Sequence, residues 1–222
     1  MGTSRLQLYN DALLLCGERS ISSLTVNEES RRLLDQVWNN GGVDGCLEQG
    51  QWQFAMRTQQ IYSNPSEDPP FGYRLAFDKP SDWISTSAVC TDEFFTQPLL
   101  QYADELELWY ADIDPIYVKF VSDDVNYGGD PSLWPQSFAD YVDCYFASRI
   151  VAKLTGGSPE RMRFIFGPPG KLDGGELGRR LKVAKSRAAM TQSTQFPPEG
   201  SWNRARRGTG GGERGNRGSL IG

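Results

Sequence analysis

The stretch PQSFADYVDCYFASRIVAKL, residues 135–154, is the segment on which the expected helical fold depends. Its apolar side chains recur every three or four residues, which is the period of one face of an α-helix. Pro135 suits the first turn of a helix, because no intrahelical hydrogen bond is lost there. Gly156 and Gly157 follow the last apolar residue and predict the end of this helix.

Shorter helical patterns flank this stretch in the sequence. Residues 4–17 are predicted as a first helix, with Ser4 as its cap and Gly17 at its end. Asn27 is predicted to cap a second helix that begins at residue 28 and has a kink or a break near residues 39–42, where glycines weaken it. Residues 158–166 add one or two turns. Residues 176–190 form a last helix with one apolar face. Its remaining faces carry basic residues (Arg179, Arg180, Lys182, Lys185 and Arg187).

Residues 52–121 show a different pattern. Apolar and polar residues alternate at 52–56, 73–77 and 106–110, and an apolar run follows at 117–121, as expected of half-buried strands. Six prolines between residues 65 and 115 exclude one continuous helix. We therefore expect a mainly α (α+β) protein. Residues 1–50 and 130–191 would form a four-helix bundle, residues 51–129 an inserted small antiparallel β-sheet region, and residues 192–222 an extended Gly/Arg-rich C-terminal arm.

Composition excludes several kinds of active site. The chain has 222 residues, of which 38% are hydrophobic, and it contains no histidine. Catalytic triads and metal sites that need histidine are therefore excluded. We expect buried, reduced thiols rather than disulfides or a zinc site, because no two of the four cysteines form a Cys-x-x-Cys pair (Cys16, Cys46, Cys90 and Cys144). The longest apolar run, Ala12–Cys16, is far shorter than the ~20 residues of a membrane span, and the start lacks a signal peptide, so we expect a soluble, unexported protein.

Charge divides the chain into an acidic body and a basic tail. Residues 192–222 carry five arginines and two glutamates, whereas the other 191 residues hold 18 basic and 26 acidic side chains. The glycine-rich tail is expected to be disordered alone in solution, and one interpretation is a solvated terminus without a role. Against that interpretation, Trp202 stands beside Arg204, Arg206 and Arg207, and such residues anchor interfaces.

Candidate chemical motifs are weak. In the segment 167–171 (GPPGK), Ile165 and Leu172 stand where a phosphate-binding loop needs glycine and serine or threonine, so we interpret it as a loop. The acidic pairs Asp112/Asp114 and Asp123/Asp124 are interpreted as solvated turns rather than magnesium ligands. The sequence fixes no distance between the carboxylates of Asp92, Glu93, Asp104 and Glu105. It therefore gives no evidence that two of them form an acid–base pair. The aromatic residues between Trp83 and Trp134 lie among acidic ones, which favours packing over base stacking.

Several ordered segments resemble the phage head–tail adaptor family that includes tail tubular protein A. The opening helix resembles the family's in Tyr9–Leu13 and Cys16–Glu18, and a loop at Ile21–Asn27 follows it. Cys46-Leu47 with Trp52–Ala55 resembles the end of the family's second helix. Further similar segments are Tyr73–Leu75, Pro80–Trp83, Leu108–Val121, Pro135–Leu154 and Lys171–Met190. The glycines at 41, 42 and 45 and the Gly/Arg tail depart from the family pattern.

The resemblance implies a structural virion protein without catalytic residues, metal or cofactor. Such adaptors form a homo-oligomeric ring, usually of twelve copies, between the portal protein and a downstream tail protein (a nozzle or tail completion protein), at the head–tail interface of a virion assembled in the host cytoplasm. DNA passes through the lumen without sequence-specific contacts, and no membrane is involved. We expect the C-terminal arm to bind the portal through Trp202, Arg204, Arg206, Arg207, Arg214, Arg217, Leu220 and Ile221.

Two other hypotheses remain open. The arginine–glycine pairs of the tail are compatible with a nucleic-acid-binding accessory protein, whose affinity for DNA would fall steeply with salt. A hydrolase that uses carboxylates such as Asp123 and Asp124 has the least support.

Overall fold

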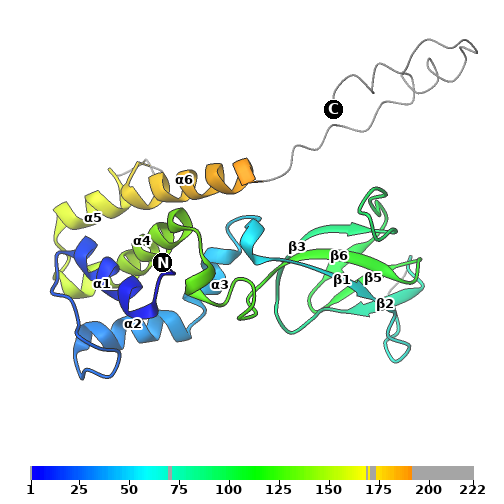
Figure 1. The fold of residues 1–222 in the computed structure, drawn as a ribbon, viewed down its shortest axis with the longest axis horizontal. Helices are drawn as coiled ribbons and strands as arrows, with labels where there is room; N and C mark the ends of the chain where they lie inside the picture. The colour runs from blue at the N-terminus through cyan, green and yellow to red at the C-terminus, as the bar shows by residue number, and fades with distance from the viewer. Residues whose placement is uncertain (1, 70–71, 169, 171–173, 192–222) are drawn as a thin grey trace, which may run out of the picture. The chain divides into compact units, whose positions relative to one another are not determined.

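The computed structural model describes residues 2–69, 72–168, 170 and 174–191, which belong to one unit ending at Thr191 (Figure 1). Its helices are α1 (Arg5–Cys16), α2 (Glu29–Asn39), α3 (Gly42–Leu47), α4 (Gln136–Leu154), α5 (Pro159–Phe166) and α6 (Glu176–Thr191). Its strands are β1 (Met56–Ile61), β2 (Leu75–Asp78), β3 (Trp83–Cys90), β4 (Ala103–Glu105), β5 (Leu108–Ala111) and β6 (Ile116–Ser122). Two short 3₁₀ turns span Gln53–Ala55 and Pro131–Leu133.

Helix α4, which confirms the helix predicted at 135–154, is the centre of the helical part. Ten of its 19 residues are buried, and α1, α2, α3, α5 and α6 all contact it. A helix buried on more than one face needs neighbours on each, which explains why the shorter helices gather around it. The predicted helices at 158–166 and 176–190 are confirmed as α5 and α6.

The predicted ends of α1 are also confirmed. The hydroxyl of Ser4 accepts a hydrogen bond from the Gln7 N–H, and Gly17 adopts a left-handed conformation (φ 80°) that ends the helix. The expected break in the second helix is confirmed at Gly41, whose φ of 73° separates α2 from α3. The predicted cap is wrong, because α2 begins after Glu28 instead of Asn27, and no side chain bonds its first turn.

The strands form two three-stranded antiparallel sheets, with the orders β1-β6-β3 and β2-β5-β4. A second apolar core, separate from that of the helices, draws residues from both sheets, which therefore pack face to face. This core contains Phe77, Val89, Trp109, Ala111, Ile116, Val118 and Phe120.

The strand predictions hold where apolar alternation is strong. Strands β2, β5 and β6 lie within or close to the predicted runs. The strand predicted at residues 52–56 is wrong. The indole N–H of Trp52 donates to the Leu47 carbonyl at 2.9 Å, and the Trp52 ring packs on Phe138 in the helical core. Strand β3 was not expected from the sequence, since its central residues are polar and two register shifts interrupt its pairing with β6.

The predicted fold class is wrong. The described residues contain six helices and two small sheets, a mixed α+β fold rather than a four-helix bundle. The difference lies in the packing, because the pieces separated at Gly41, Gly156 and Gly157 pack around α4 as individual short helices instead of forming four long ones. The strands contribute a core of their own instead of a minor insertion.

All four cysteines are buried and unpaired, as expected. Burial raises the pKa of Cys16 to about 11 and that of Cys144 to about 12, so both are protonated thiols at neutral pH. Among the described residues, no helix combines the length and the apolar character that a membrane crossing requires.

Candidate functional site

The eight residues predicted to bind the portal lie outside the described residues. Trp202, Arg204, Arg206, Arg207, Arg214, Arg217, Leu220 and Ile221 all fall within 192–222. The candidate surfaces described below therefore come from residues 2–191.

The acidic pairs seen in the sequence accept hydrogen bonds from backbone and hydroxyl groups. Asp112 accepts the Arg74 backbone N–H at 2.9 Å, and Asp114 accepts the Ser63 hydroxyl at 2.8 Å. Asp124 likewise accepts the N–H of Asn126, two residues later, at 2.8 Å. Only the Asp124 bond closes a local turn, whereas the bonds of Asp112 and Asp114 reach segments 38 and 51 residues earlier in the chain. In the described part of the chain, no group of three or more acidic or cysteine side chains is arranged to hold a metal ion.

The remaining candidate carboxylates serve separate structural roles. Asp92 accepts hydrogen bonds from Thr96 and Gln97 in the loop after β3, and the bond from the Thr96 hydroxyl is the main cause that lowers the pKa of Asp92. Asp104 instead bonds to Lys79. The structure therefore assigns these two carboxylates to different partners instead of one acid–base pair.

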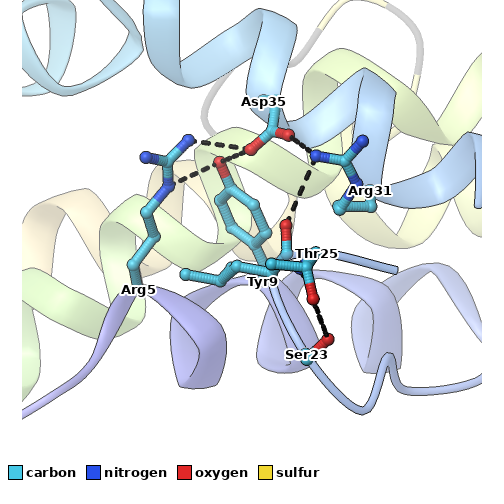
Figure 2. Close-up of polar contacts among 7 residues, drawn as sticks. Arg5, Tyr9, Ser23, Thr25, Arg31 and Asp35 are labelled. Carbon is cyan, nitrogen blue, oxygen red and sulfur yellow. Dashed lines mark hydrogen bonds and ion pairs between the residues drawn. The ribbon is translucent and has the colours of Figure 1, made fainter. Parts of the chain in front are cut away.

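A polar network joins α1 to α2, and Figure 2 shows its geometry. Asp35 accepts hydrogen bonds from Arg5 at 2.8 Å, from the Tyr9 hydroxyl at 2.9 Å and from Arg31 at 2.6 Å. The guanidinium of Arg5 also lies 4.6 Å from the centre of the Trp38 ring. Burial raises the pKa of the Tyr9 hydroxyl, which therefore remains a hydrogen-bond donor to Asp35. Each charged side chain of the network is in an ion pair, while the buried Nε of Arg31 has no hydrogen-bond partner within the described residues. We interpret this network as a structural clasp between the two helices.

A groove of about 560 Å³ lies between the start of α4, the second half of α6 and the segment 52–54. We call it the α4–α6 groove. Helix α6 lines it with side chains three or four residues apart, and two of these are the small Ala184 and Ala188, which leave space beside α4. The complete lining is Trp52, Gln53, Phe54, Pro135, Gln136, Ser137, Phe138, Asp140, Val183, Ala184, Arg187, Ala188 and Thr191.

The groove is mainly apolar and has two charged residues in its lining. Val183 is 42% exposed, which is high for a valine beside a core. Arg187 is exposed and has no ion pair within the described residues. Asp140, on the other wall, accepts a hydrogen bond from the Gln136 amide at 2.7 Å. The groove therefore offers apolar surface together with one positive charge that has no ion-pair partner in the described part of the chain.

A lysine cage supports the turn between β4 and β5. The side chain of Lys79 is only 4% exposed, and its ammonium lies 3.7 Å from the centre of the Trp83 ring. It pairs with Asp104 and donates to the Leu106 carbonyl at 2.7 Å. Asp104 also accepts from the Trp109 indole at 3.1 Å. The cage thus fixes the turn from inside the β-rich part.

The turn that this cage supports presents an exposed apolar side chain between two carboxylates. Leu106 is 94% exposed, the largest exposed fraction among the large hydrophobic residues described, and Glu105 and Glu107 beside it are exposed too. Its φ is 41°, a conformation that leucine rarely adopts. We call residues 105–107 the β4–β5 tip. A strained and exposed apolar tip marks a candidate contact surface.

The charges are strongly segregated along the chain. Residues 149–191 carry ten basic and three acidic side chains, whereas residues 2–148 carry eight basic and 23 acidic ones. Most of the basic group lies on α5 and α6, so a positive region adjoins the α4–α6 groove. Such segregation favours association with an acidic surface.

Helix α4 also holds a buried carboxyl group. Asp143 is 3% exposed, and its Oδ1 has no hydrogen-bond partner within the described residues. Burial, followed by the nearby charges of Asp11 and Asp140, raises its pKa to about 8, against the opposing effect of Arg180. Asp143 is therefore mostly protonated at neutral pH.

Sequence reasoning missed the groove, the lysine cage and the buried acid. The four-residue spacing of Ala184 and Ala188 places both on one face of a helix, but the gap beside them depends on the position of α4. Leu106 belongs to the alternation at residues 106–110 that predicts a half-buried strand, so the sequence carries no signal that this leucine is exposed in a turn.

No protein-family model matches the sequence. A search of the curated proteins likewise finds no significant match.

Proposed function

We propose that this chain is a structural virion protein, a head-to-tail adaptor that assembles as a ring, usually of twelve copies, between the portal and the downstream tail protein. The observation that carries the proposal is the order of the segments between Tyr9 and Met190 that resemble the adaptor family. The protein acts at the head–tail interface, after assembly in the host cytoplasm, and needs no catalytic group or cofactor.

The distribution of charge supports this function. The excess of acidic side chains in residues 2–148 repels the phosphate backbone of DNA, so a channel built from them would not hold passing DNA. The basic stretch 149–191 continues into the arginine-rich arm, and both would attract an acidic docking surface. The arm would bind the portal through Trp202 and the arginines that follow it.

Particle mass tests the proposal directly. Purified portal from the same phage is mixed with the full chain, and the complexes are measured by native mass spectrometry and imaged. A ring of this chain on the portal is the expected result. A chain that stays monomeric and leaves the mass of the portal unchanged would refute the adaptor function.

Two truncations test the predicted role of the arm. Removal of residues 200–222 should abolish portal binding and leave the helical and β-rich parts folded, as judged by circular dichroism. Removal of residues 208–222 alone is the matched control, because it keeps Trp202, Arg204, Arg206 and Arg207 and should retain part of the affinity. Equal affinity of all three proteins for the portal would show that the arm is not the docking segment.

A second candidate function, nucleic-acid binding, is favoured by the basic residues of α5 and α6 together with the arginines of the arm. It predicts binding of free duplex DNA at low salt, with an affinity that falls steeply as salt rises. Filter binding at about 20 mM salt, below the range in which phosphate contacts are strongly weakened, decides this point. Absence of binding there excludes the second function.

A further inference from the structure

We propose that the β4–β5 tip of one copy docks into the α4–α6 groove of a second copy of this chain. The inference rests on the proposed function and deepens it, because it names the surfaces through which neighbouring subunits of the ring join. The two surfaces are different parts of the molecule, so their contact is head-to-tail and generates a ring when the rotation between copies closes.

The tip has the properties of a preformed ligand. Leu106 extends into solvent, and the turn that carries it is held at two points: Lys79 Nζ donates to the Leu106 carbonyl at 2.7 Å, and the Lys79 backbone N–H donates to the Glu107 carbonyl at 2.9 Å. The ammonium of Lys79 is itself held by Asp104 and Trp83. A turn fixed in this way loses little conformational entropy on binding.

The groove complements the tip in apolar character and in charge. Its apolar lining residues, among them Phe54, Val183 and Ala188, match an aliphatic side chain such as that of Leu106. Arg187 lies in the lining and has no ion pair within the described residues, whereas Asp140, the other charged lining residue, accepts a hydrogen bond from Gln136. Glu105 and Glu107 flank the leucine of the tip and match the charge of Arg187. The surrounding α6 has five basic residues and one acidic residue, so its field attracts the two glutamates.

One side chain tests the tip without threatening the fold. Leu106→Gly removes the docking side chain and also relieves the positive φ, so the variant should fold at least as well as the wild type. Loss of one buried leucine should weaken self-association about 10- to 100-fold. The matched control is Leu100→Ser, since Leu100 is 88% exposed but lies outside the tip, and it should associate as the wild type does.

The groove is tested by charge reversal on α6. Arg187→Glu places a negative charge in the groove and should weaken association about tenfold at low salt, with a smaller effect at high salt. Lys185→Glu makes the same change of charge on the opposite side of the helix, two residues away, and is the control. Glu105→Lys with Glu107→Lys should also weaken association, and combining these two substitutions with Arg187→Glu should restore it.

The measurement is sedimentation velocity of the full chain over a range of concentrations, alone and with portal. The inference is supported if the wild type associates, Leu106→Gly and Arg187→Glu each lose association, both controls keep it and the charge swap restores it. It is overturned, and the proposed function kept, if the wild type associates and these two variants do so equally well. It is also overturned if Arg187→Glu abolishes portal binding alone, because the groove then holds the portal. A wild type that is monomeric both alone and with portal overturns the inference and the proposed function together.

Discussion

Replacing Asp143 by asparagine should remove a specific pH dependence of stability. Asp143 is buried on α4, next to the charges of Asp11, Asp140 and Arg180, and its pKa is raised to about 8. In the unfolded chain an aspartate has a pKa near 4. Between these two values the folded protein holds one proton that the unfolded chain has lost, so the free energy of unfolding falls as pH rises.

The expected size follows from a single proton. One proton held only by the folded state makes the free energy of unfolding fall by about 1.4 kcal/mol per pH unit. Between pH 5.5 and 7.5 the wild type should therefore lose about 2–3 kcal/mol through this group. Asparagine has nearly the same shape and does not titrate. The stability of Asp143→Asn relative to the wild type should rise by that amount across the same interval, and level off above pH 8.

Urea unfolding followed by tryptophan fluorescence measures this difference at each pH. Other groups titrate equally in both proteins, so the difference between the two curves isolates Asp143. Asp140→Asn is a suitable control, because it changes a neighbouring charge and leaves the buried carboxyl in place, so most of the pH slope should remain. If wild type and Asp143→Asn show the same slope between pH 5.5 and 7.5, Asp143 does not hold a proton in the folded state.

Three other substitutions test the structural networks. Asp35→Ala removes the shared acceptor of the α1–α2 clasp and leaves the Tyr9 hydroxyl without its partner, so it should lower the free energy of unfolding by about 1–3 kcal/mol in urea titrations; no change would mean that the clasp is dispensable. Lys79→Met keeps the length of the side chain but leaves Asp104 without its cation, and it should destabilise the β-rich part by about 2–4 kcal/mol, seen as faster amide exchange there and not in the helices. Gly17→Ala forces alanine into a φ of 80°, close to the Arg161 side chain, and should lower the melting temperature through a loss of about 1–2 kcal/mol; an unchanged midpoint would contradict the left-handed cap.

Local features were predictable from the sequence. The 3.6-residue period located α1, α4 and α6, and the glycine at position 41 located the break between α2 and α3. The burial of the four cysteines was also predictable. Each of these features depends on contacts within a few residues or on the general preference of a residue type for the interior, both of which a sequence displays directly.

The tertiary structure alone decided how these elements combine. The number of packed helices was mispredicted, because the sequence shows where a helix breaks but not how the resulting pieces pack around α4. Strand β3 was missed because its polar centre is held by pairing with β6, about 30 residues later. The predicted portal-binding residues, all after Thr191, stay a prediction.

The candidate surfaces show the same division. The sequence alone determined the acidic body and the basic stretches that follow it. Only the fold brought Trp52 and Phe138 beside Ala188 to form the groove, and only the fold enclosed Lys79 between Trp83 and Asp104. Each of these two groups contains residues that are 25 or more positions apart in the sequence. No local rule specifies such contacts, because they stabilise the protein only after distant segments have packed together.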